Sequence, residues 1–243
     1  TKASLTADGV NALVKLEQPK NVSPRNERNT GLYHFALLLP TRKDLGIVLK
    51  HLIETRNPLQ GGSDHLVSEA LYLADPDMNG IEIYADRPSE NWQWNNDYVM
   101  MDSRRLDAEG LLALAENEEF TGLPKETIMG HIHLQVSDLA STETFYCEGL
   151  GFDVVTKYGS QALFISTGRY HHHLGLNTWH SAGGSAPSES SVGLKQFTLL
   201  FPSEEEKSNA MARITKLGAP IYEENGATLT KDPSGNTIEL LVG

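Results

Sequence analysis

The chain has 243 residues, of which 39% are hydrophobic, and its formal net charge at pH 7 is −12. This length suits two ordinary domains, and no stretch approaches the roughly 18 consecutive apolar residues that a membrane span requires. The negative charge disfavours nucleic acid and anionic membranes as main partners, because both are polyanions. A single cysteine, Cys147, excludes an internal disulfide framework. We therefore expect a cytoplasmic protein with no nucleic-acid partner and no membrane partner.

The beginning of the chain contains three predicted strands and one helix. The first 18 residues are typical of two short strands around an Asp8-Gly9 turn, and a Pro- and Asn-rich loop follows. The apolar run GLYHFALLL then predicts a strand that carries His34. Thr41 caps a predicted helix over 42–54, whose leucines recur on one face.

A hairpin is predicted next, in ALYLADPDMNGIEIY at residues 70–84, where Asp-Pro-Asp and Asn-Gly are turn-forming pairs. Because side chains alternate along a strand, Glu82 lies on the face opposite the two isoleucines, and His34 shares a face with Ala36. One imidazole and one carboxylate are two of the three ligands in the 2-His-1-carboxylate set that binds non-haem Fe(II). A lone strand histidine is more often a hydrogen-bonded core residue, so both interpretations stay open.

A polar, irregular stretch at 89–127 separates the two halves of the chain. It contains Trp92, Trp94 and a predicted short helix over 108–116. We interpret this stretch as the link between two domains, packed against the protein by its apolar residues.

The second half begins with GHIHLQVSDL, a predicted strand on which His131 and His133 share a face. A helix is expected after Asp138, followed by the strand GFDVVTKY and two strands around a Thr-Gly turn. The strand LKQFTLLFP, a helix capped by Ser203, and the hairpin TLTKDPSGNTIELLV complete the chain.

These elements repeat in a fixed order. GLYHFALLLP corresponds to GLKQFTLLFP, and LADPDMNGIEIYA corresponds to LTKDPSGNTIELLV. The spacing also agrees, since Glu82 follows His34 by 48 residues and Glu239 follows Gln196 by 43. A strand-helix-three-strand module used four times explains this pattern. The first module starts at a strand that the third module reaches only after about thirty residues, so we expect a longer natural chain whose first elements are missing here.

With its paired modules, GHIHLQVSDL…FYCEGLGF and DPDMNGIEIY, the chain resembles the vicinal oxygen chelate superfamily, and most of all its catechol 2,3-dioxygenase-like branch. The superfamily also contains glyoxalase I and the fosfomycin and bleomycin resistance proteins. The resemblance implies an α+β fold of repeated βαβββ modules, in which each module pair forms a cup-shaped mixed sheet. It implies one domain at 1–88 with a truncated first module, a linker at 89–127 and a second domain at 128–243.

The resemblance also implies roles for residues of the first cup. His34 takes the second metal-ligand position and Glu82 the third, whereas the first position falls in the missing segment. Tyr72 matches the tyrosine that hydrogen-bonds the substrate in extradiol enzymes. His65 falls near their active-site histidine, with a small offset in position.

In the second cup, His131 takes the first ligand position and Glu239 the third, and His172 matches a histidine that assists proton transfer. The chain departs from the dioxygenase pattern at two positions. Gln196 stands where the second histidine is expected, and Leu229 where the tyrosine is expected. A glutamine carbonyl oxygen can bind a metal in glyoxalase I enzymes, so the resemblance leaves metal binding in this cup open.

Taken together, the resemblance implies a metal-dependent extradiol dioxygenase that acts on a small aromatic substrate and O2. The expected cofactor is Fe(II), with Mn(II) or another divalent metal as the alternative. Two other functions stay open, a glyoxalase-like lyase or transferase and a metal-free protein that sequesters an aromatic compound. Members of this group often pair, which makes a homodimer an expectation as well.

Overall fold

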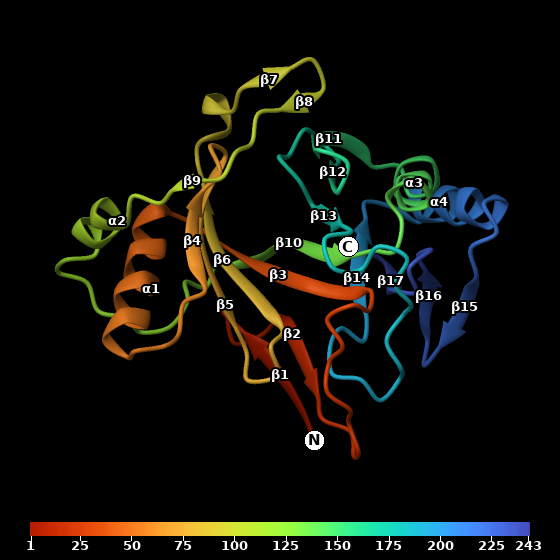
Figure 1. Ribbon diagram of the computed structural model, residues 1–243, viewed down its shortest axis with the longest axis horizontal. Coiled ribbons are helices and arrows are strands. Elements are labelled where there is room, and N and C mark those ends of the chain that lie inside the picture. The colour runs from red at the N-terminus through yellow and green to blue at the C-terminus, as the bar shows by residue number, and fades with distance from the viewer. The chain divides into compact units, whose positions relative to one another are not determined.

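The computed structural model in Figure 1 describes all 243 residues. The chain divides into two compact units, which are described separately below. Unit 1 contains residues 1–22 and 34–132, and unit 2 contains residues 23–33 and 133–243. Both units combine helices with β-sheets, which confirms the predicted α+β class. No helix is both long enough and apolar enough to span a membrane.

The main sheet of unit 1 has the strand order β3-β6-β5-β4-β9. These strands are β3 (Gly31–Leu39), β6 (Gly80–Asp86), β5 (Ser68–Ala74), β4 (Gly61–Asp64) and β9 (Arg104–Arg105). β3 and β6 are parallel and the other neighbours are antiparallel, so the sheet is mixed, as predicted. A separate hairpin, β1 (Lys2–Thr6) and β2 (Ala12–Glu17), confirms the predicted strands around Gly9, whose φ of +80° favours glycine.

Two helices pack against each other in unit 1, α1 (Arg42–Glu54) and α2 (Ala108–Leu114). The predicted limits of α1 are confirmed, because the Thr41 hydroxyl accepts the Asp44 N–H at the start of the helix. α2 is two residues shorter than predicted. A Cβ at Gly46 would lie 2.3 Å from the Leu111 carbonyl oxygen, so this close approach of the helices requires glycine.

The segment after β6 also belongs to unit 1. A 3-10 turn at Ser89–Asn91 leads into a small hairpin of β7 (Trp94–Asn95) and β8 (Tyr98–Val99), and the chain returns as β9 to pair with β4. The indole N–H of Trp92 donates to the carbonyl groups of Val67 and Arg87. Backbone pairing and these hydrogen bonds therefore attach the segment to the sheet.

Unit 2 contains two sheets and two long helical segments. One sheet has the order β11-β12-β13 and the other β14-β17-β16-β15. The strands are β11 (Asp153–Tyr158), β12 (Ala162–Ser166), β13 (Leu174–Asn177), β14 (Phe197–Phe201), β15 (Ile221–Glu224), β16 (Ala227–Lys231) and β17 (Thr237–Val242). The predicted cap of α4 (Glu204–Lys216) is confirmed, since the Ser203 hydroxyl accepts the Glu206 N–H.

The predicted helix after Asp138 begins as α3 (Leu139–Glu143) and continues as a π-helical turn at Thr144–Gly149. Hydrophobic periodicity gave no indication of this wider turn. Strand β10 (Ile128–Gln135) supplies its first five residues to unit 1 and its last three to unit 2. His131 therefore belongs to unit 1 and His133 to unit 2.

Candidate metal centre

Three neighbouring strands of unit 1 place polar side chains on one face. In the parallel pair of β3 and β6, Ala36 lies opposite Glu82, and His34 comes two residues earlier on β3. In the antiparallel pair of β5 and β6, Tyr72 lies opposite the same glutamate. Because side chains alternate with a period of two, His34, Tyr72 and Glu82 share a face. Register alone therefore brings these predicted residues together.

The closest contacts on this face surround the Glu82 carboxylate. Its Oε2 atom lies 2.9 Å from Nε2 of His34 and 3.1 Å from Nε2 of His131. All three side chains are buried, with residue exposures of 7% for His34 and 3% for Glu82 and His131. One potential ligand atom from each residue lies within 4.8 Å of the others. Two imidazole nitrogens and one carboxylate oxygen therefore converge on a small buried region.

The charge state of Glu82 suits a metal ligand. Burial alone would raise the pKa of this carboxyl group, but the charge and hydrogen bond of His131 and the hydrogen bond of His34 lower it well below the usual value. The carboxylate is therefore ionised near neutral pH. The donor set is the 2-His-1-carboxylate set that holds divalent iron and leaves positions open for other ligands. The residues present thus fit a divalent metal ion.

The strand that carries His131 approaches the sheet closely. A Cβ at Gly130 would lie 1.9 Å from the hydroxyl oxygen of Tyr84, which is fully buried. The Tyr84 ring also lies against the His131 ring, with 4.8 Å between ring centroids. Glycine at residue 130 therefore lets β10 bring His131 within reach of Glu82.

A second pair of predicted residues lies beside the cluster. Nε2 of His65 is 2.7 Å from the Tyr72 hydroxyl oxygen, and Nδ1 of His65 is 2.8 Å from the carbonyl oxygen of Asp102. A carbonyl oxygen can only accept, so Nδ1 carries a proton, and in that tautomer of the neutral imidazole Nε2 accepts the Tyr72 hydroxyl. The Tyr72 ring in turn lies 5.7 Å from the His34 ring, measured between centroids. The structure therefore joins His65 and Tyr72 to the face that carries His34.

The other residues assigned to the second cup lie in unit 2. The Glu239 carboxylate accepts hydrogen bonds from the Gln196 amide and the Thr198 hydroxyl, each at 3.1 Å. His172 is 2.8 Å from His171, measured between their Nδ1 atoms. The sequence had grouped His131 with Glu239, whereas the structure places His131 against Glu82. The repeat assigned each ligand to its own module, and nothing in the local pattern indicated which distant strand would lie beside β6.

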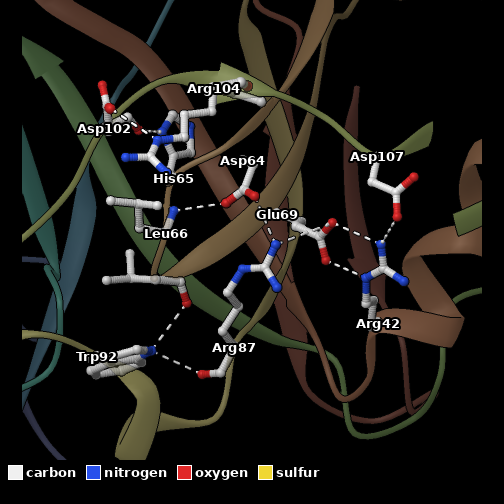
Figure 2. Close-up of polar contacts among 12 residues, drawn as sticks. Arg42, Asp64, His65, Leu66, Glu69, Arg87, Trp92, Asp102, Arg104 and Asp107 are labelled. Carbon is white, nitrogen blue, oxygen red and sulfur yellow. Dashed lines mark hydrogen bonds and ion pairs between the residues drawn. The ribbon is translucent and has the colours of Figure 1, made fainter. Parts of the chain in front are cut away.

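Sequence reasoning missed two residues near this site. Asp102 acts through its backbone carbonyl group, which no side-chain pattern can indicate. Glu69 is only 1% exposed and bonds to Arg42, as Figure 2 shows. An acidic residue in a strand next to a predicted hairpin was the available signal, because buried carboxylates are almost always paired.

Comparisons with known proteins agree with this architecture. Residues 128–240 match the Glyoxalase/Bleomycin resistance protein/Dioxygenase superfamily. A catechol-2,3-dioxygenase of Bacillus subtilis strain 168 is 48% identical over 248 residues, which cover 99% of this chain and 86% of that protein. This identity extends along both units.

Among solved structures, the chain is similar to a proposed dioxygenase from Bacillus subtilis, with a TM-score of 0.54 and 15% identity. That match covers 87% of this chain and 62% of the other, so the chain spans less than two thirds of that protein, and the likeness concerns the fold alone. The whole-length relative and the matched domain together identify the chain as a member of the glyoxalase/bleomycin resistance protein/dioxygenase superfamily, the vicinal oxygen chelate group that its sequence resembles.

Proposed function

We propose that this protein is a metal-dependent extradiol dioxygenase of the catechol 2,3-dioxygenase type. It opens the ring of a catechol beside the two hydroxyl groups and uses O2 as the oxidant. The observation that carries this proposal is the convergence of His34, His131 and Glu82 next to the hydrogen-bonded pair of Tyr72 and His65. The whole-length similarity to a catechol-2,3-dioxygenase supports the same reaction.

In this proposal, His34, His131 and Glu82 hold one divalent metal ion, which we propose to be Fe(II), with Mn(II) as the alternative. When bound, such an ion supplies Lewis acidity to the catechol oxygens and a position for O2. The three side chains act by holding their donor atoms in a fixed, buried arrangement. Their rigidity comes from β3 and β6, whose register fixes His34 relative to Glu82, and from the close approach of β10.

Proton movement is assigned to Tyr72 and His65. The Tyr72 hydroxyl donates to Nε2 of His65, so its oxygen keeps a lone pair for a substrate hydroxyl. When the catechol loses a proton to the Tyr72 oxygen, the tyrosine proton passes to Nε2 of His65. The resulting imidazolium is stabilised at Nδ1 by the Asp102 carbonyl oxygen. The same chain returns the proton as the ring opens.

The overall reaction balances without another reagent. Both atoms of O2 enter the ring-opened product, one carbon–carbon bond breaks, and no external reductant is consumed. The protein contributes by orienting the reactants and by moving one proton reversibly. Burial of the three ligands strengthens each electrostatic contact, because the surrounding dielectric constant is low.

The test is purification without oxygen, loading with Fe(II), and addition of catechol and air while O2 uptake and the yellow ring-cleavage product are recorded. We expect about one metal ion per chain and coupled consumption of catechol and O2. The matched control is Glu82→Gln, which keeps the size of the side chain and removes its negative charge. Metal binding without ring cleavage in the wild-type protein would contradict the proposed reaction, and absence of metal binding would contradict the centre itself.

A further inference from the structure

His65 sits on a tight turn between β4 and β5. Its backbone N–H donates to the Ser68 carbonyl oxygen at 2.8 Å, which closes the turn. The next residue, Leu66, has a φ of +70°, a left-handed conformation that is strained for a side chain with a Cβ atom. Other contacts must therefore hold this turn in shape, and strained backbone of this kind is frequent at functional sites.

The Asp64 carboxylate connects the turn that carries His65 to Arg87. Its Oδ1 atom accepts the backbone N–H of Leu66 at 2.8 Å, and its Oδ2 atom accepts a hydrogen bond from Nη2 of Arg87 at 2.8 Å. Figure 2 shows the carboxylate between the turn on one side and the guanidinium group on the other. One side chain thus links the backbone after His65 to an arginine just beyond β6.

Arg87 also forms an ion pair with a buried carboxylate. Its Nη2 atom lies 3.6 Å from Oε1 of Glu69, a carboxylate on β5. Arg42, the first residue of α1, also binds Glu69 through two nitrogen atoms and reaches Asp107 at 3.0 Å. The turn is therefore connected through Arg87 and Glu69 to the first turn of α1 and to the cap of α2 (Figure 2).

The imidazole ring is held from its other end by the chain before β9. The Asp102 carbonyl oxygen accepts the Nδ1–H of His65. The Asp102 side chain accepts hydrogen bonds from the Ser103 N–H and from Nε of Arg104, and Arg104 pairs with Asp64 in the β4–β9 ladder. Asp64 therefore participates in both supports of the histidine, through its backbone and through its side chain.

We propose that Asp64 and Arg87 are positioning residues for His65, which keep Nε2 aimed at the Tyr72 hydroxyl and Nδ1 at the Asp102 carbonyl group. The catalytic consequence of this proposal rests on the proposed dioxygenase function. Their side chains bond to the Leu66 N–H, to Glu69 and to each other, and not to the metal ligands. Their effect is on geometry, and a displacement of about 1 Å in a catalytic group can reduce a rate by about a hundredfold.

The kinetic test compares Arg87→Met, Arg87→Lys and Asp64→Asn with Arg105→Met, an exposed arginine on the neighbouring strand, as the control. We expect kcat to fall at least about tenfold in Arg87→Met and Asp64→Asn, with KM for catechol and metal content unchanged. Arg87→Lys should recover part of kcat because lysine retains the positive charge. Wild-type kcat in folded Arg87→Met and Asp64→Asn would overturn the proposal.

A second measurement does not depend on activity. NMR of protein labelled with 15N-histidine reports which ring nitrogen of His65 is protonated, with His65→Asn used to assign the signal. We expect a single Nδ1–H form in the wild-type protein and in Arg105→Met, and a mixture of tautomers in Asp64→Asn. Identical His65 signals in Asp64→Asn and the wild type would overturn the proposal. If the wild-type protein does not cleave catechol, the proposed function fails, and this spectrum still decides the positioning role.

Discussion

The β5–β6 hairpin of unit 1 and the β16–β17 hairpin of unit 2 are built on the same turn. In unit 1, Asp75 accepts the backbone N–H groups two and four residues later and the side-chain amide of Asn79. In unit 2, Asp232 makes the same three hydrogen bonds, the last with Asn236. The shared DP-x-x-N pattern therefore produces the same local structure in both places.

The strand register is also shared, but the side chains differ. Tyr72 lies opposite Glu82 in one hairpin, and Leu229 lies opposite Glu239 in the other. Glu82 contacts two imidazoles, whereas Glu239 accepts hydrogen bonds from Gln196 and a threonine. The comparison shows that one backbone frame can carry a metal-ligand set or an ordinary polar cluster, and that replacing a few side chains decides which.

The largest expected effect is a difference in metal binding between variants that replace Glu82 and Glu239. Glu82→Gln should remove bound metal and ring cleavage, because the buried site loses its only anionic ligand. Glu239→Gln is the matched variant on the corresponding strand, and it should retain about one metal per chain. Both contents are measured on protein loaded with Fe(II) without oxygen. Equal metal loss in the two variants would contradict the assignment of the metal ion to Glu82.

Tyr72, which corresponds to Leu229 in unit 2, should affect catalysis and not metal content. Tyr72→Phe removes the hydroxyl that links the substrate to His65, so kcat should fall by about a hundredfold or more. Tyr158→Phe, at an exposed tyrosine, is the control. Steady-state kinetics with metal analysis separate the two effects. A wild-type kcat in Tyr72→Phe would contradict the role of the Tyr72 hydroxyl in catalysis.

The shared turn provides a smaller effect on stability. Asp75→Ala removes three side-chain hydrogen bonds and Asp232→Ala removes four, and we expect each variant to lose about 1–3 kcal/mol of stability. The Asp232 variant should be affected more, because Asp232 is buried and also accepts the hydroxyl of the fully buried Tyr146. Urea unfolding of the two variants measures the difference. A larger loss in Asp75→Ala would contradict this ranking.

The smallest expected effect is a pH dependence of the metal-free protein. His131 and His34 overcome the effect of burial and hold the pKa of Glu82 well below the ordinary value of 4.5 for a glutamate. The stability gained from the ionised carboxylate is therefore present above pH 4.5 and is lost as the pH falls through the lower folded pKa. Urea unfolding at pH 7 and below pH 4.5 should show a weaker acid dependence in Glu82→Gln. An identical dependence would contradict the lowered pKa.

Much of the frame could be predicted because its signals are local. Thr41 and Asp44 determine where α1 begins, and the DP-x-x-N turns determine both hairpins. Alternation along the two strands indicated the face on which His34 and Glu82 each lie, and the family resemblance assigned both residues to one ligand set.

The remainder depended on contacts between distant segments. His131 follows Glu82 by 49 residues, and the repeat assigned it to a different module. Its place beside Glu82 depends on how closely β10 can approach Tyr84, which is a property of Gly130 in three dimensions. His65 is also held by the backbone carbonyl group of Asp102. Every residue type has this group, so the sequence cannot indicate the contact.

The metal centre is tested most directly by calorimetric titration of the metal-free protein with Mn(II), compared between the wild type and His131→Ala. We predict one ion per wild-type chain and a loss of binding of at least about a hundredfold in the variant, because one of the three ligands of the 2-His-1-carboxylate set is removed. Two ions per chain, or unchanged affinity in His131→Ala, would contradict a single centre formed by His34, Glu82 and His131.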